Sequence, residues 1–280
     1  MFVRRSLIIR NCSKRFYHIF LINLFPKTFL DNLFPKTFFN KPFSQKFLIN
    51  FFLKSFTYIF YIPCVNIVPM RDIVVIGHKA NTSGDFTLND LPGSAGRMDI
   101  LCRCVSSALF LSFGMRRDVN VHLLLLGEPD PGKILRFEGL HLRYLNPDER
   151  SSGSLIQKAL QKNATEQDIR STPGVWIRRG NLDSLLSEFE GRTLLYLRED
   201  GEDIRAIANE IRDPVFILGD HVGVTEEEEA QLLKAGAKII SVGPLSLHSN
   251  HCITLIHNEL DRAEAERGEL PGEADSRIED

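Results

Sequence analysis

A chain of 280 residues with 43% hydrophobic and 25% charged residues is long enough for one large globular domain or two small ones. Its formal charge of −2 conceals a split, because residues 1–69 hold ten Lys/Arg and one acid whereas residues 70–280 hold 24 and 35. Five scattered cysteines indicate no disulfide framework, and no apolar stretch reaches the roughly 18 residues of a membrane span. We therefore expect a cytoplasmic protein that does not cross a membrane.

The first 69 residues differ from the rest in composition. Fourteen of the twenty phenylalanines lie there, and no helix or strand period persists. One interpretation is a basic targeting or membrane-surface extension. The interpretation we favour is translated upstream sequence with the true start at Met70, because a regular α/β pattern begins at that residue.

From Met70 onward, the sequence alternates between strand and helix patterns. A predicted strand at Asp72–Ile76 is followed by a glycine-rich loop over residues 77–96. Apolar residues at helical spacing predict a helix over Met98–Phe113. The next predicted elements are the strands Val121–Leu126, Lys133–Phe137 and Leu140–Leu145, the helix Asp148–Leu160, the short strand Val175–Ile177 and the helix Leu182–Phe189.

The second half of the chain repeats a strand, a loop and a helix three times. The predicted strands are Thr193–Leu197, Val215–Leu218 and Lys238–Val242, and the predicted helices are Ile204–Ile211, Thr225–Ala235 and a last one with apolar spacing from Leu245 to Ile256. Such units predict a parallel sheet with helices on its faces. The end of the chain, Glu259–Asp280, has nine acids and three arginines, which is typical of a solvated tail.

Two of these strands end in turns that contain glycine. Val215–Leu218 leads into Gly219–Gly223, and the last strand leads into Gly243-Pro244. In α/β proteins, ligands bind outside the carboxyl ends of the strands, and glycine lets the backbone approach a ligand closely. We therefore expect the two turns, on neighbouring strands, to form two walls of one pocket.

Eight motifs stand in order along residues 70–261. They are LPGSAGRMDILCRC (Leu91–Cys104), MRRD (Met115–Asp118), GEP (Gly127–Pro129), NPDERS (Asn146–Ser151), STPG (Ser171–Gly174), YLREDGED (Tyr196–Asp203), ILGDHVG (Ile217–Gly223) and SVGPLSLHSNHCI (Ser241–Ile253). In this order and spacing they resemble the archaeal tRNA pseudouridine-54 N1-methyltransferase family, TrmY, of the SPOUT methyltransferases. Over residues 70–261 the resemblance implies an α/β fold with a parallel sheet, helices on both faces and a C-terminal trefoil knot. Composition adds the acidic tail, over residues 262–280.

The resemblance also implies an activity. It implies a homodimer that transfers a methyl group from S-adenosylmethionine to N1 of pseudouridine at position 54, in the tRNA T-loop, giving N1-methylpseudouridine. In such knotted enzymes three loops bind the cofactor, and the matching residues here are Leu197, Gly219, Val242, Leu245, Leu247 and Cys252. Taken alone, Cys252 is typical of core packing; the resemblance makes a place in the cofactor site an equal alternative.

Methylation at N1 requires that the N1 proton leaves, so a proton acceptor is expected. Asp99 is the candidate acceptor, and Arg97 is the candidate group that holds a phosphate or the base carbonyl. Equally, Asp99 could serve only to favour the helix N-terminus. Because the body is acidic, phosphate contacts must come from a local patch. The candidate RNA-binding residues are Arg97, Arg103, Arg116, Arg117 and Arg150.

Alternatives to this function stay open from the sequence. One is a related knotted methyltransferase that acts on pseudouridine in ribosomal RNA, and another is a non-catalytic RNA-binding module of the same fold. A dinucleotide-dependent enzyme lacks its main marker, because no predicted strand is followed by G-x-G-x-x-G. The histidine and cysteine spacings do not match a zinc site, so we expect no metal.

Overall fold

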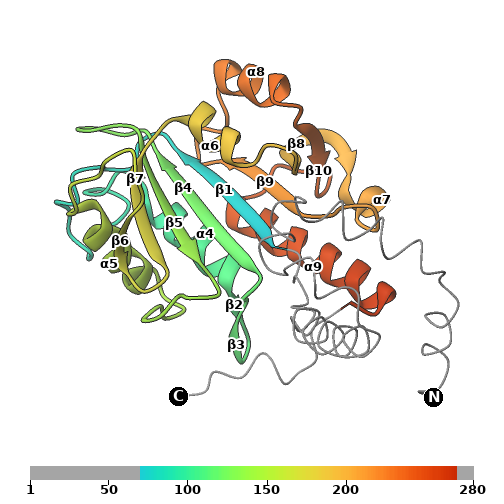
Figure 1. Ribbon diagram of the computed structural model, residues 1–280, viewed down its shortest axis with the longest axis horizontal. Coiled ribbons are helices and arrows are strands. Elements are labelled where there is room, and N and C mark those ends of the chain that lie inside the picture. Colours follow the sequence, from blue (N-terminus) through green and yellow to red (C-terminus); the bar gives the residue numbers. More distant parts are fainter. Residues whose placement is uncertain (1–69, 270–280) are drawn as a thin grey trace, which may run out of the picture. The chain divides into compact units, whose positions relative to one another are not determined.

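The computed structural model describes residues 70–269 (Figure 1). The predictions for residues 1–69 and 270–280 lie outside the described residues. Among residues 70–269, no helix combines the length and the apolar character needed to cross a membrane.

One eight-stranded sheet, with strand order β10-β8-β9-β1-β4-β5-β7-β6, organises the described chain. Five strands run parallel: β10 (Lys238–Ser241), β8 (Thr193–Asp203), β9 (Pro214–Gly219), β1 (Arg71–Gly77) and β4 (Val119–Leu125). Three strands extend the sheet in antiparallel pairing: β5 (Lys133–Glu138), β7 (Val175–Arg179) and β6 (Ile169–Thr172). The predicted parallel sheet is thus confirmed for its larger part.

Helices cover both faces of the sheet, as predicted. Helices α4 (Met98–Leu109), α5 (Glu149–Leu160) and α9 (Ser249–Arg267) pack on one face, and α6 (Leu182–Glu188) and α8 (Glu226–Lys234) pack on the other. Strand β1 lies in the middle and alternates its fully buried side chains between the two cores, with Ile73 and Val75 in one and Val74 and Ile76 in the other. A strand buried on both faces must be continuously apolar, which explains its sequence.

Two predictions for the segment between α4 and β5 are wrong. The helix predicted to reach Phe113 ends at Leu109, and a hairpin of β2 (Phe110–Leu111) and β3 (Gly114–Met115) follows, with Phe113 at its exposed tip. Residues 140–145, predicted as a strand, form an irregular loop. Arg117 donates hydrogen bonds to the carbonyls of Gly139 and Leu142, so part of this backbone bonds to a side chain and not to another strand.

Two further boundaries differ around β8. The polar residues 198–203, predicted to follow the strand, continue it and pair with β10, where Ile240 faces Glu202. The next helix, α7 (Ile204–Ile207), is shorter than predicted. Strand β6 is absent from the prediction, because its half-exposed residues carry no alternating apolar pattern.

Helix α9 begins later and ends later than predicted. Leu245 and Leu247 lie in the loop before it, and the helix continues to Arg267, past the predicted domain boundary at residue 261. The prediction of a solvated tail is therefore wrong for residues 262–267. Glu264, one of the acids that suggested a tail, is buried and pairs with buried Arg71 at 2.6 Å. The trefoil knot stays a prediction of the resemblance.

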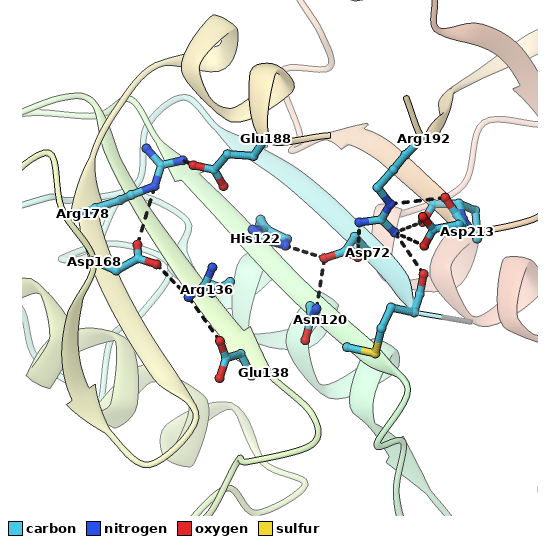
Figure 2. A network of polar contacts seen from close by, with 12 residues as sticks. Asp72, Asn120, His122, Arg136, Glu138, Asp168, Arg178, Glu188, Arg192 and Asp213 are labelled. Atoms are coloured by element: carbon cyan, nitrogen blue, oxygen red, sulfur yellow. Dashed lines mark hydrogen bonds and ion pairs between the residues drawn. The ribbon is translucent and has the colours of Figure 1, made fainter. Parts of the chain in front are cut away.

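The face of the sheet that carries α6 and α8 also bears a polar network (Figure 2). Its centre is Asp72, whose carboxylate lies 2.6 Å from His122 Nε2 and accepts a 2.7 Å bond from Arg192. A second part joins Arg136 to Asp168 at 2.7 Å on the antiparallel side of the sheet. Asp72, His122 and Arg136 lie on β1, β4 and β5, and Arg192 and Asp168 directly precede β8 and β6, so opposite charges from separate segments pair on this face.

Candidate functional site

Three loops converge on one cavity of about 190 Å³ that opens to solvent: the irregular part of β8 after Tyr196, where its pairing with β10 shifts register, and the segments that follow β9 and β10. All six residues predicted for the cofactor line it: Leu197, Gly219, Val242, Leu245, Leu247 and Cys252. The two glycine turns do not follow neighbouring strands, because β8 lies between β9 and β10 and supplies the third wall. The cavity thus occupies the carboxyl edge of the parallel strands, where the strand pattern placed it.

Glycines shape two of its walls. A Cβ atom at Gly219 would lie 2.2 Å from the carbonyl oxygen of Gly223, so any side chain there would push the second loop apart. Gly243 adopts φ 154°, and a Cβ there would meet no atom within 4 Å. Neither position carries a side chain that would keep a ligand away from the loop backbone.

Hydrogen bonds join the three loops. Ser249, the first residue of α9, donates to the carbonyl of Gly219 at 2.7 Å, and Ser241 Oγ donates to the carbonyl of Gly243 at 2.8 Å. A hydrogen bond from Ser246 lowers the pKa of Glu199, which links the first loop to the third. The walls are therefore held in place by the protein itself.

Apolar side chains stand at the mouth of the cavity without cover. Leu245 is 73% exposed and Leu247 is 41% exposed, which is unusual for large apolar residues placed next to each other in a loop. Burial raises the pKa of the half-buried Cys252 thiol, so the thiol stays protonated at neutral pH and is a poor nucleophile. A slot lined by leucine side chains and glycine backbone fits a flat, adenosine-containing ligand that packs against leucine.

Arg97 and Asp99 lie together at the start of α4. Asp99 is 3% exposed and accepts bonds from Arg97 Nε at 3.0 Å and Arg103 Nη2 at 2.7 Å. Burial alone would raise the pKa of Asp99, but the bonds from Arg97 and Arg103 outweigh burial and lower it. Arg97 itself is 41% exposed, and its pKa is raised mainly by the hydrogen bond to Asp99. A Cβ atom at the preceding Gly96 would lie 1.8 Å from the carbonyl oxygen of Lys79, and His78, next to Lys79, donates its backbone N–H to Asp220 on the cavity wall. The cavity and the Arg97 loop are therefore near neighbours.

The five predicted RNA-binding arginines fall into two groups. Arg103 lies on α4 one turn after Asp99 and pairs with Glu149, and Arg150 is exposed on the neighbouring α5. Arg116 and Arg117 lie beyond the other end of α4, and Arg116 is bound to Asp261 of α9. With a rise of about 1.5 Å per residue, α4 is roughly 18 Å long, and Arg103 lies about halfway along it. The structure therefore brings Arg97, Arg103 and Arg150 to one side and leaves Arg116 and Arg117 at the opposite edge.

The sequence analysis missed three residues that adjoin the cavity. Asp220 lines its wall, His78 contacts Asp220, and Glu228 contacts His78 from α8. The available signal was weak: His78 directly follows a buried strand, and Asp220 follows the glycine that ends another. Their proximity depends on residues about 140 to 150 positions apart.

A parallel-dominated α/β sheet, with a glycine-walled cavity at the carboxyl ends of its strands and an open arginine beside it, defines a class of enzymes that bind an adenosine-containing cofactor. The family described as "Putative SAM-dependent RNA methyltransferase" matches residues 70–265. The chain belongs to this family.

Known relatives are similar over most of their length. A protein of Methanosarcina acetivorans named tRNA (pseudouridine(54)-N(1))-methyltransferase is 87% identical over 203 residues, 72% of this chain and 96% of the relative. A protein of the same name from Methanocaldococcus jannaschii is 46% identical over 69% of this chain and 97% of the relative.

Among solved structures, Archaeoglobus fulgidus Nep1 bound to S-adenosylhomocysteine is similar in fold. The TM-score is 0.52 at 18% identity, and the match covers 70% of this chain and 99% of Nep1.

Proposed function

We propose that this protein transfers a methyl group from S-adenosylmethionine to N1 of pseudouridine at position 54 of tRNA. The relatives that are 87% and 46% identical over 203 and 201 aligned residues carry that activity in their names. The observation that carries the proposal on this chain itself is the convergence of three loops on one cavity beside Arg97.

The cavity residues suit S-adenosylmethionine, which supplies an electrophilic methyl group on a sulfonium when it is bound. Leu197, Val242 and Leu245 offer apolar walls for the adenine. Because Gly219 and Gly243 carry no side chain, the edge of the adenine can approach the loop backbone closely. Transfer of a methyl group is an in-line displacement, so these residues contribute alignment and the exclusion of water more than covalent chemistry.

We propose that Arg97 contacts the nucleoside and that Asp99 orients Arg97. The open guanidinium of Arg97 can donate to a base carbonyl or a phosphate, while Asp99 accepts from two arginines. With both neighbours bound and a lowered pKa, Asp99 is a weak base in this arrangement. A water molecule or a rearranged Asp99 can accept the N1 proton once RNA has displaced Arg97. Arg103 and Arg150 extend the RNA contact along α4 and α5.

A homodimer is part of the proposal. The uncovered leucines at the cavity mouth, Leu245 and Leu247, are the support for it, because a second copy of the chain could cover them. Light scattering of the purified protein tests this: a mass of one chain would contradict it. A tRNA substrate also supports the cytoplasmic location expected from the sequence.

The test of the function is transfer of labelled methyl groups from S-adenosylmethionine to two tRNA transcripts that differ only in uridine or pseudouridine at position 54. We expect label on the pseudouridine transcript alone, as N1-methylpseudouridine by mass spectrometry. Labelling of ribosomal RNA in place of tRNA would overturn the substrate. Cofactor binding with no labelling of the tRNA transcripts or of ribosomal RNA would favour the non-catalytic alternative.

A further inference from the structure

His78 lies between the cofactor cavity and the Arg97 loop, and the proposed function gives it no role. It directly follows β1, and its side chain is 15% exposed. Its position at the central strand of the sheet places it behind the cavity wall that Asp220 forms.

Both ring nitrogens of His78 face carboxylates. Nδ1 lies 3.2 Å from Asp220 Oδ1, and Nε2 lies 3.0 Å from Glu228 Oε2. A neutral imidazole carries one N–H, so only the protonated ring can donate to both partners. The hydrogen bonds that the ring donates to Asp220 and Glu228 raise the pKa of His78 to about 9, and the ring is therefore a cation at neutral pH.

The contacts of His78 hold the second cavity loop at both of its ends. At the start of the loop, Asp220 also accepts the backbone N–H of His78 at 2.9 Å and that of Val222 at 2.8 Å. At the end of the loop, Glu228 accepts the backbone N–H of Thr225, whose side chain caps α8. One histidine thus ties the entry and the exit of the loop to the end of β1.

The residues after His78 pack against the loop that carries Arg97. The backbone N–H of Asn81 donates to the carbonyl of Ala95 at 3.0 Å. A Cβ atom at Gly96 would lie only 1.8 Å from the carbonyl oxygen of Lys79, so the two backbones are in direct contact. The segment from His78 to Asn81 therefore touches the cavity wall on one side and the Arg97 loop on the other.

We infer that His78 is a positioning residue for methyl transfer, because it fixes the cavity wall at Asp220 relative to the loop that presents Arg97. This inference rests on the proposed function. An in-line displacement is sensitive to misplacement of the reacting atoms by about 1 Å, which can lower a rate about 100-fold. A loosened wall would therefore reduce kcat more than the affinity for the cofactor.

Other charged groups near His78 are few among the described residues. His221 Nδ1 lies 3.6 Å from Asp220 Oδ2 on the same loop. The guanidinium of Arg97, at the start of α4, interacts electrostatically with Asp220. Lys79, the next residue along the chain, is exposed. The two carboxylates of Asp220 and Glu228 thus dominate the surroundings of the ring.

The test compares His78→Gln with His78→Arg in the full chain. Glutamine cannot donate to both carboxylates as a cation, so we expect kcat to fall about 10- to 100-fold while KM for S-adenosylmethionine changes by less than about threefold. Arginine can donate to both and stays charged at every accessible pH. We expect His78→Arg to recover most of kcat, and the ratio of its kcat to the wild-type kcat to rise between pH 8 and pH 10.

A matched control is His141→Gln, which removes a histidine that also pairs with a carboxylate, Glu138, but is 64% exposed. It should leave kcat and its pH profile unchanged. A readout independent of activity is the NMR titration of the His78 ring in the protein without cofactor, expected near pH 9.

Wild-type kcat in a folded His78→Gln variant, or a ring that titrates near 6.5, would overturn the inference. Equal loss in His78→Gln and His78→Arg, with both folded, would also overturn it. If the wild-type protein fails to methylate pseudouridine-54 tRNA, the proposed function fails. The titration then still decides whether His78 binds both carboxylates as a cation.

Discussion

Two clusters of arginine and carboxylate side chains lie near the two ends of helix α4 and have different roles. At its N-terminus, Arg97 is 41% exposed beside the cavity. Beyond its C-terminal end, Arg71 is 1% exposed and pairs with Asp261 at 2.7 Å and Glu264 at 2.6 Å. The first cluster keeps a donor available to a ligand, and the second uses its donors to hold α9. Both clusters contain the same residue types, so exposure distinguishes the binding site at Arg97 from the buried cluster of Arg71, Asp261 and Glu264, which we call the anchor.

The charges of the anchor are also compensated by its own members and immediate neighbours. Arg116 provides a second guanidinium to Asp261, and burial lowers the pKa of the neighbouring His257 well below its usual range, so the ring is neutral beside two arginines. At the cavity, in contrast, the side chains of Leu245 and Leu247 stay 73% and 41% exposed in the described chain. We therefore expect substitutions in the anchor to lower stability and substitutions at the cavity to lower cofactor binding or activity.

The largest effect is expected at the anchor. Arg71→Met leaves Glu264 buried without its partner, and breaking a buried ion pair costs about 3–5 kcal/mol of unfolding free energy. Urea denaturation measures the loss. The control is Arg205→Met, whose guanidinium is 70% exposed against Asp203 and should matter little. A change in cofactor affinity larger than the change in stability would contradict the division.

The next effect is expected at the cavity wall. Gly219→Ala forces a Cβ atom to 2.2 Å from the Gly223 carbonyl and displaces the second loop. We expect affinity for S-adenosylmethionine to fall about 100-fold by calorimetry. Gly236→Ala is the control: Gly236 has a positive φ of 87°, so alanine strains its backbone, but Gly236 has open space around it and does not line the cavity. Normal affinity in Gly219→Ala would remove this loop from the site.

A smaller effect on catalysis is expected at the open arginine. Arg97→Ala removes a charge-assisted hydrogen bond to the nucleoside, and such a bond corresponds to a loss of roughly 10- to 100-fold in kcat/KM for tRNA. Cofactor affinity should be unchanged. Arg117→Ala serves for comparison, because Arg117 lies at the far edge and bonds to backbone carbonyls. Equal losses of activity in both variants would mean that RNA contacts both edges.

The smallest effect is a dependence of stability on pH. Since the pKa of His78 rises from 6.5 to about 9 on folding, its contribution is complete below pH 6.5 and is lost as pH rises through about 9. The contribution is on the order of 2 kcal/mol for a group that keeps some contact with water. The difference in unfolding free energy between wild type and His78→Gln should therefore shrink between pH 7 and pH 10. A constant difference would show that the charge of the ring is not involved.

The cofactor cavity could be predicted because its signals are local. Buried strands that end in glycine turns specify loops at one edge of a sheet, so Gly219 and Gly243 were found from neighbouring residues alone. His78, Asp220 and Glu228 could not be predicted as a cluster, because their contacts join residues 142 and 150 positions apart. The end of α9 could not be predicted for the same reason. The acidic composition around Asp261 indicates a solvated segment, but Asp261 accepts a hydrogen bond from Arg71, 190 positions earlier.

The most direct measurement is a crystal structure of the full chain with S-adenosylhomocysteine and a T-loop RNA that contains pseudouridine. We expect the adenosine among Leu197, Val242 and Leu245, and the pseudouridine base within hydrogen-bond distance of Arg97. Cofactor density outside the three loops, or an RNA base seated at the Arg116 edge, would contradict the account.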